Sequence, residues 1–223
     1  MPYAIAIDGP SGAGKSTLAK ALAKKLNFIY VDTGALYRAL GYRMMEQNIS
    51  PEDEKTVIEA LAHTQVTLAY VDGVQRVFAD GKDVSDLIRT PAVAKAASRV
   101  SAIPEVRAFL LKTQRDLAEA NSVLMDGRDI GTVVLPQAQV KIFLTASPEA
   151  RARRRFDDLQ KAGDTTPYET VLADINQRDY NDSHRATAPL RPAEDSVTVD
   201  TSDETLQDSL DRLETLIRQR LGL

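Results

Sequence analysis

The sequence predicts an α/β protein in which a parallel β-sheet is flanked by helices. Short apolar runs that are typical of buried strands alternate with longer segments of helical periodicity, the pattern of strands joined by crossover helices. A glycine-rich turn directly follows the first apolar run, at residues 9–16. Near residues 66–79 the hydrophobic period changes from about 3.6 to about 2, which indicates a small antiparallel hairpin inserted into the α/β chain.

The glycine-rich turn is Gly9-Pro-Ser-Gly-Ala-Gly-Lys-Ser16, which fits the P-loop pattern G-x-x-x-x-G-K-[ST] between a strand at 3–8 and a helix at 15–26. Its glycines let backbone amides approach a polyphosphate, and the helix N-terminus extends this anion site. Lys15 is expected to reach the β- and γ-phosphates, and the Ser16 hydroxyl to bind Mg²⁺. A turn that serves packing alone is the alternative, but Lys-Ser in register favours a nucleoside triphosphate site. The residues expected to bind it are Gly9, Pro10, Ser11, Gly12, Ala13, Gly14, Lys15, Ser16 and Thr17.

Composition limits the classes of function. The chain has 223 residues, 43% hydrophobic and 27% charged, which is ordinary for a globular protein and suggests one domain with insertions. Its net charge of −4 argues against broad nucleic-acid binding. It contains no cysteine, which excludes disulfides and thiolate metal sites. No apolar run approaches the roughly 18 residues of a membrane span, and the first strand leaves no room for a signal peptide, so we expect a cytoplasmic protein.

The next segments lead from the second strand to a helix that carries a candidate phosphate ligand. Residues 28–31 are predicted to form that strand, and Asp32-Thr-Gly-Ala-Leu-Tyr-Arg38 opens a helix to about residue 47, with Asp32 or Thr33 as its N-cap. Ligands of parallel sheets bind beyond the carboxyl ends of the strands, so Arg38 is expected near a second phosphate. The alternative is an exposed helix arginine. A further helix is expected to begin at Ser50, with Pro51 in its first position.

The middle of the chain is predicted to form an inserted subdomain. Strands at 66–71 and 74–79 are joined by Asp72-Gly73, and Asp80-Gly81 makes a second turn. Helices are expected at 91–100 and 104–119, the second with proline in its first turn.

A third strand of the parallel sheet is expected at 123–126, followed by Gly127-Arg-Asp-Ile-Gly131. A carboxylate and an arginine just beyond a strand end lie where catalysis is expected, and Asp126 can order Mg²⁺ or its waters. The fourth and fifth strands are expected at 140–145 and 197–200, and an amphipathic helix at 203–221 closes the domain.

Two arginine-bearing helices precede the fifth strand. The first is capped by Ser147 and carries Arg151, Arg153, Arg154 and Arg155, of which Arg151 and Arg155 are expected to share a face. A break at 163–166 separates it from a helix at 167–182 that carries Arg178 and Asp182, with Arg185 just beyond. This pattern predicts a mobile lid over the triphosphate, the alternative being a solvated face. A single P-loop domain is thus expected over 1–223, with its core at 1–34, 101–148 and 186–223, an insert at about 35–100 and a lid at about 149–185.

The charged groups favour phosphoryl transfer. This reaction needs mainly positioning and charge neutralisation, and the sequence offers no covalent nucleophile near the P-loop. A second arginine cluster predicts an anionic acceptor, and a nucleoside monophosphate fits that description. Two alternatives remain: a kinase with another acceptor, or a nucleotide-dependent switch, which the absence of a guanine-reading N-K-x-D disfavours. The arginines are at positions 38, 107, 128, 151, 155, 178 and 185.

Several motifs together resemble the bacterial cytidylate kinase family over nearly the whole chain. Besides the P-loop they are Asp32-Thr-Gly-Ala-Leu-Tyr-Arg38, Ile88-Arg-Thr-Pro, Ala97-Ser98, Pro104-Glu-Val-Arg107, Asp126-Gly-Arg-Asp-Ile-Gly-Thr-Val-Val134 and Arg178-Asp-x-x-Asp182-x-x-Arg185-x-x-x-Pro-Leu190. The resemblance implies a P-loop NTPase-type sheet of five parallel strands, a helical lid and a monophosphate-binding insert with a small antiparallel sheet. The implied reaction transfers phosphate from ATP to CMP or dCMP with Mg²⁺.

The resemblance also implies residue roles. Ser98, Arg107 and Asp129 would read cytosine, because a carboxylate can accept from its exocyclic amine. The CMP phosphate would be held by Arg38, Arg128 and Arg185, and the ribose by Arg178 and Asp182, with Thr33 also at the substrate. Catalysis would use Lys15, Arg128, Arg151 and Arg155, and Mg²⁺ would use Ser16 and Asp126. We expect a monomer with no nucleic-acid or membrane partner. Two positions depart from the family pattern: Ala92 replaces a common glutamate, and Asn181 a frequent basic residue.

Overall fold

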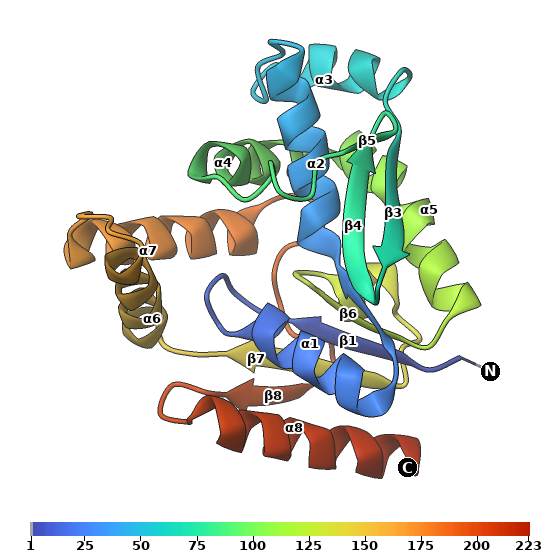
Figure 1. Ribbon diagram of the computed structural model, residues 1–223, viewed down its shortest axis with the longest axis vertical. Coiled ribbons are helices and arrows are strands. Elements are labelled where there is room, and N and C mark those ends of the chain that lie inside the picture. Colours follow the sequence, from blue (N-terminus) through green and yellow to red (C-terminus); the bar gives the residue numbers. More distant parts are fainter. Residues whose placement is uncertain (1) are drawn as a thin grey trace.

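A five-stranded parallel sheet in the order β2-β6-β1-β7-β8 forms the centre of the protein (Figure 1). It is seen in a computed structural model that describes residues 2–223. The central strand β1 is apolar and nearly fully buried, as a parallel strand covered on both faces should be. The predicted parallel sheet is confirmed, and β1 delivers the P-loop to the middle of its carboxyl edge. The strands are β1 (Ala4–Asp8), β2 (Ile29–Asp32), β6 (Val123–Gly127), β7 (Val140–Thr145) and β8 (Val197–Asp200).

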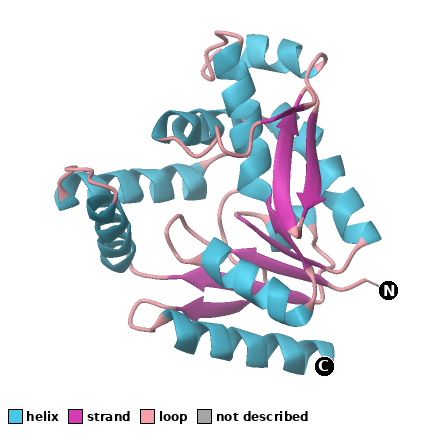
Figure 2. Ribbon diagram, viewed as in Figure 1, coloured by secondary structure: helices cyan, strands magenta, loops and turns pink. Residues whose placement is uncertain are grey.

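Helices cover both faces of this sheet (Figure 2). On one face α1 (Lys15–Leu26) and α8 (Leu206–Leu221) pack on the strands through a cluster that includes Leu18, Leu22 and Leu213. On the other face α5 (Pro104–Ala120) and the π-helical turn η1 (Ile130–Val134) enclose a second apolar cluster. The helices therefore hold the sheet rigid at the edge where the P-loop emerges.

The insert shares an apolar core with α5, which contributes Val106 and Leu110. It contains α2 (Thr33–Glu46), α3 (Glu54–Leu61), α4 (Pro91–Val100) and an antiparallel sheet of β3 (Val66–Val71), β4 (Val74–Ala79) and β5 (Lys82–Asp83). Asp72 and Gly73 both have positive φ, 52° and 75°, which joins β3 to β4 by a tight two-residue turn. The predicted hairpin is confirmed, and β5 is an additional short strand that the sequence reading missed.

Two helices project from the sheet beside the P-loop, α6 (Pro148–Lys161) and α7 (Tyr168–His184) (Figure 1). They pack on each other through a small separate cluster formed by Ala152, Val171 and Ile175. Ser147 caps α6 as predicted, accepting a hydrogen bond from the Ala150 amide at 3.2 Å. The predicted helical lid is therefore a two-helix unit with few apolar contacts to the main core.

Two predicted helix starts were wrong by about three residues. The helix α3 begins at Glu54 rather than Pro51, because Asp53 is its cap and accepts from the Thr56 amide at 3.2 Å. The helix α8 begins at Leu206 rather than residue 203, because Thr205 and Asp208 form a reciprocal capping box. In both cases a cap further along the chain sets the start. Of the two predicted caps for α2, Asp32 is the one used.

Across residues 2–223, we find no helix that is both long and apolar enough to cross a lipid bilayer.

Gly41 generates the first prediction, because α2 packs tightly against α4 at this residue. A Cβ on Gly41 would lie 2.8 Å from the Ala97 nitrogen and 3.1 Å from the Ala96 carbonyl carbon. In an open helix, glycine to alanine stabilises by about 1 kcal/mol, whereas overpacking destabilises by about 1–3 kcal/mol. We expect Gly41→Ala to lower the free energy of unfolding, measured by urea denaturation. A more stable variant would contradict the close packing of α2 against α4.

Candidate active site

A cleft of about 460 Å³ opens at the carboxyl edge of the parallel sheet. The P-loop, the ends of β2 and β6, helix α4 and the lid helices each contribute part of its wall. It brings together residues from all of the predicted groups. Those that line it are Ser11, Gly12, Gly14, Lys15, Ser16, Thr17, Thr33, Arg38, Ser98, Arg107, Asp126, Arg128, Asp129, Arg178, Asp182 and Arg185. Gly9, Pro10, Ala13, Arg151 and Arg155 are not part of this lining.

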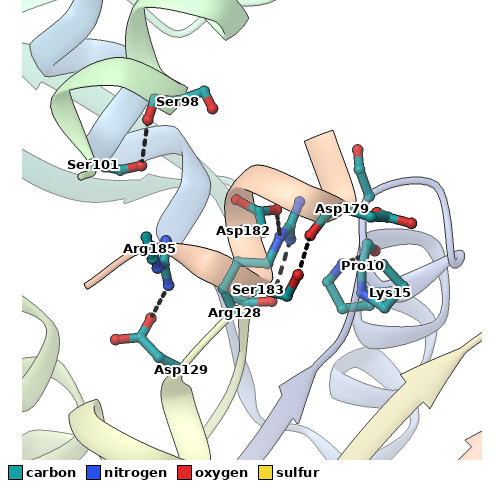
Figure 3. Close-up of polar contacts among 12 residues, drawn as sticks. Pro10, Lys15, Ser98, Ser101, Arg128, Asp129, Asp179, Asp182, Ser183 and Arg185 are labelled. Carbon is teal, nitrogen blue, oxygen red and sulfur yellow. Dashed lines mark hydrogen bonds and ion pairs between the residues drawn. The ribbon is translucent and has the colours of Figure 1, made fainter. Parts of the chain in front are cut away.

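The P-loop begins pressed against strand β7. Gly9 has a φ of +150°, and a Cβ there would lie 1.9 Å from the Leu144 carbonyl oxygen, so only glycine fits. Further along, the buried Lys15 ammonium donates to the Pro10 carbonyl at 2.7 Å (Figure 3). Burial, with the nearby charge of Arg128, lowers the pKa of Lys15. The Lys15 ammonium is thus held by the backbone of the P-loop itself.

The candidate metal residues lie together at the start of α1. The Ser16 hydroxyl donates to Asp126 Oδ2 at 2.8 Å, and the Tyr30 hydroxyl donates to Asp126 Oδ1 at 3.1 Å. Burial, together with the charge of Asp32, raises the pKa of Asp126. Within residues 2–223 we find no cluster of three or more metal-binding side chains, so a cation here would share Ser16 and Asp126 with phosphate and water oxygens. The donor set fits Mg²⁺ bound with a nucleotide.

Three arginines in the cleft are only partly satisfied. Arg38 Nε, Arg178 Nε and Arg185 Nη2 are buried and have no hydrogen-bond partner among the described residues. Burial, with the charge of Arg128 nearby, lowers the pKa of Arg178; burial, with Arg107, does the same for Arg185. A buried donor without a partner is unfavourable, so these nitrogens indicate that the cleft binds an anionic ligand.

One corner of the cleft holds the predicted base-reading residues. Arg107 and Asp129 form a buried ion pair, and Arg107 also donates to the Ser101 carbonyl at 3.1 Å. The Ser101 hydroxyl in turn donates to the Ser98 carbonyl at 2.9 Å (Figure 3). Arg185 Nη2 lies 3.9 Å from Asp129 Oδ1 in the same corner. Arg185 thus lies beside a residue expected to read the base, and its predicted role at the substrate phosphate stays a prediction.

Two lining residues in this corner were missed by sequence reasoning. The guanidinium carbon of Arg107 lies 5.4 Å from the centre of the Tyr37 ring, a cation–π contact. Tyr37 stands directly before Arg38 in a motif that was already singled out, so its position was a usable signal. Ser101 follows Ser98 by one helical turn and carries no such signal.

A second ion pair joins the loop after β6 to the lid. Arg128 Nε donates to Asp182 Oδ2 at 2.8 Å (Figure 3). Burial raises the pKa of Asp182, but the positive charges around it, chiefly that of Arg128, outweigh this effect and hold the pKa below its usual value. Thr33 has a structural contact here, since its hydroxyl donates to the Asp126 carbonyl at 2.8 Å. The loop, the lid and the start of α2 therefore meet in one network.

The structure does not bring Arg151 and Arg155 together. Arg151 is buried, donating to the Ser11 carbonyl at 3.1 Å and to both carboxylate oxygens of Asp179 at 3.0 and 2.6 Å. Arg155 is exposed, and Arg154 lines the cleft instead. A run of arginines on one helix does not reveal which one faces the cleft, because this depends on how α6 docks. The two departures from the family pattern, Ala92 and Asn181, are exposed.

Asp8 holds the loop that carries Arg128 and Asp129, and sequence reasoning missed it. Its carboxylate accepts from the Ile130 and Gly131 amides, both at 2.7 Å, at the N-terminus of the π-helical turn. At the other end, Arg115 donates to the Val133 and Val134 carbonyls at 3.0 Å. Burial raises the pKa of Asp8 to about 6, against the opposing effect of the two amides. Opposite charges thus hold both ends of the turn, as its dipole favours.

The chain is similar to known proteins over nearly its whole length. The sequence model of the cytidylate kinase family matches residues 5–219. A cytidylate kinase from Caldanaerobacter subterraneus subsp. tengcongensis is 52% identical over 96% of this chain and 94% of its own length. One from Caldicellulosiruptor bescii is 50% identical over 94% and 92%. The structure of a shikimate kinase from Bacteroides thetaiotaomicron shares the fold, with 17% identity, a TM-score of 0.50 and 99% of both chains covered.

The unsatisfied arginines generate the second prediction. Arg178→Met keeps the length of the side chain and removes a buried charge, so the ligand-free protein should become more stable, by about 1 kcal/mol. Urea denaturation measures this change, and Arg99→Met, at an exposed arginine of α4, is the matched control with no expected change. A clear loss of stability in Arg178→Met would mean that its charge is already compensated without a ligand.

Proposed function

The chain belongs to the cytidylate kinase family, and we propose that its cleft is where the γ-phosphate of ATP passes to CMP or dCMP. The products are ADP and CDP or dCDP. One observation carries the assignment to this cleft: three arginines line it together with the P-loop, and each has a buried nitrogen without a hydrogen-bond partner in residues 2–223. Two anionic substrates that meet there would satisfy these donors.

The donor side follows from the P-loop. The loop amides would hold the ATP phosphates, and Lys15 would exchange the Pro10 carbonyl for the β- and γ-phosphates. Ser16 and Asp126 would hold Mg²⁺, directly or through waters. The ion would neutralise charge that develops on the transferred phosphoryl group.

The acceptor side follows from the arginines and from the base corner. Arg38 and Arg128 would hold the CMP phosphate, with Arg185 between that phosphate and the base. Arg178 and Asp182 would contact the ribose. Asp129, held by Arg107, would accept from the exocyclic amine of cytosine, and Ser98 would line the opposite wall. Thr33 would help to keep the loop after β6 in place beside the substrate.

The lid supports a proposal of closure. Arg155 is exposed, so it would reach the phosphates only if α6 moved toward the P-loop. Arg151 already connects the P-loop to α7 and would carry such a movement between them. Exclusion of water by closure would protect the phosphoryl group from hydrolysis. We propose that the protein works as a monomer in the cytoplasm, where its donor ATP is maintained, without nucleic acid or membrane.

Lys15 provides the third prediction. Because it would stabilise charge on the transferred phosphate, Lys15→Ala should lower kcat by roughly 100- to 1,000-fold. A coupled assay of ADP formation with CMP measures the loss, and circular dichroism checks the fold. The exposed Lys24 of the same helix provides the control, since Lys24→Ala should keep its activity. A Lys15→Ala protein with most of its turnover would overturn the P-loop assignment.

Asp129 provides the fourth prediction, which concerns the choice of base. Its carboxylate accepts from the cytosine amine and repels the matching oxygen of uracil, so CMP should be strongly preferred to UMP. Asp129→Asn should lower the CMP to UMP ratio of kcat/KM by at least about tenfold, because an amide offers either a donor or an acceptor.

The matched control for this experiment is Asp8→Asn. This substitution weakens the hydrogen bonds that hold the same loop, but Asp8 is not expected to contact the base. It should therefore lower kcat/KM for both substrates alike. An unchanged CMP to UMP ratio in Asp129→Asn would rule out Asp129 as the residue that reads cytosine.

A further inference from the structure

The small antiparallel sheet of the insert touches the parallel sheet at its open edge. Strand β2 is the outermost strand of the parallel sheet, so one side of its backbone has no neighbouring strand in that sheet. In Figure 1 the turn end of the β3–β4 hairpin reaches toward this sheet. The Tyr70 hydroxyl of β3 donates to the Tyr30 carbonyl of β2 at 3.0 Å. The hairpin therefore covers part of an otherwise unpaired edge.

Gln75 of β4 makes the tightest of these contacts. Its Oε1 accepts from the Asp32 amide at 2.8 Å, and its Nε2 donates to the Asp32 carbonyl at 3.2 Å. One side-chain amide thus takes the place of a paired residue on a neighbouring strand, because it offers the same donor and acceptor. Both backbone groups of Asp32 are fixed by a residue 43 positions further along the chain.

Asp32 is the residue through which this contact reaches the cleft. Its carboxylate accepts from the Ala35 amide at 3.0 Å, which caps α2, and from Arg38 Nη2 at 2.7 Å. Arg38 lines the cleft, and its buried Nε has no hydrogen-bond partner in the part of the chain that the structure describes. A carboxylate that holds one nitrogen of a guanidinium also sets the direction in which the other nitrogens point. Any rotation of Asp32 would therefore turn Arg38.

We propose that Gln75 is a positioning residue for the acceptor phosphate. It fixes the backbone of Asp32, and through the Asp32 carboxylate it orients the guanidinium of Arg38, which lines the cleft. This inference rests on the proposed function, because it takes the anion held by Arg38 to be the CMP phosphate. Small errors in the placement of such a group reduce binding and rate strongly. The antiparallel sheet is then a lateral support of the binding site.

A second contact from the insert to Asp32 is weaker. Arg89 Nη2 lies 3.2 Å from Asp32 Oδ2, but the Arg89 side chain is 56% exposed. Exposed ion pairs contribute little because water screens them and long side chains lose freedom. Gln75 is therefore the contact to test.

The experiment compares Gln75→Met with Tyr70→Phe. Gln75→Met keeps the length of the side chain and removes both hydrogen bonds to Asp32. Tyr70→Phe removes a hydrogen bond to the same strand, at the Tyr30 carbonyl. CMP affinity is measured by titration calorimetry, together with KM for CMP and for ATP. We expect Gln75→Met to weaken CMP binding by about 3- to 10-fold, with KM for ATP within about twofold of wild type. Tyr70→Phe should leave CMP affinity unchanged.

A double-mutant cycle with Arg38→Met tests whether Gln75 acts through Arg38. If it does, Gln75→Met should change CMP affinity by less than about twofold in the Arg38→Met background. Equal effects in both backgrounds, or equal effects on CMP and ATP, would overturn the inference and leave Gln75 a merely structural residue. Gln75→Asn, one methylene too short to reach both backbone atoms, should show the same selective loss even where Gln75→Met folds poorly.

The positioning role of Gln75 and the proposed function can be overturned separately. A wild-type protein that binds and phosphorylates CMP, with no selective change in the Gln75 variants, overturns the positioning role alone. A wild-type protein that phosphorylates a different anionic acceptor overturns the proposed function, and the same Gln75 comparison with that acceptor then decides the positioning role.

Discussion

Repulsion among arginines confined to one cleft is the constraint around which the rest of the site is arranged. Guanidinium groups always carry charge, so the protein cannot relieve this repulsion by losing protons. Instead, an aspartate pairs with each of three arginines that line the cleft, and a fourth pair, Arg151–Asp179, joins the P-loop to the lid beside it. A chain with a net charge of −4 has acidic residues to spare for this purpose. The pairs are Arg38–Asp32, Arg107–Asp129, Arg128–Asp182 and Arg151–Asp179.

The parallel sheet explains why these pairs can lie so close together. Its adjacent strands β1, β2 and β6 end at one edge, and each brings an aspartate to that edge. Asp126 faces Ser16, Asp32 holds Arg38, and Asp8 caps the π-helical turn. Three similar side chains therefore have three different partners. Each aspartate's hydrogen bonds are local, but strand pairing brings the three carboxylates to the same edge of the sheet.

The elements that sequence reasoning placed well are those with local signals. Alternation of strands and helices, the P-loop and the Asp72-Gly73 turn all depend on neighbouring residues, so the fold and the cleft beside the P-loop could be predicted. Contacts between distant segments could not. The bond from Asp8 to Ile130 spans 122 positions and that from Gln75 to Asp32 spans 43, and neither has a signature in the chain. Likewise, which arginine of α6 faces the cleft is decided by how α6 docks onto α7 and the P-loop.

The buried arginine nitrogens without partners also bear on how long the protein persists in a cell. Ligands that bind only the folded state shift the folding equilibrium, by about 2.7 kcal/mol when the free ligand is at 100 times its Kd. Within residues 2–223, Arg38, Arg178 and Arg185 each keep a buried nitrogen without a hydrogen-bond partner, so nucleotides that bind there as proposed would supply part of the stability that the chain itself lacks. Proteases act on unfolded molecules, so abundance follows this equilibrium. The size of the nucleotide pool would then influence the protein's lifetime as well as its rate of turnover.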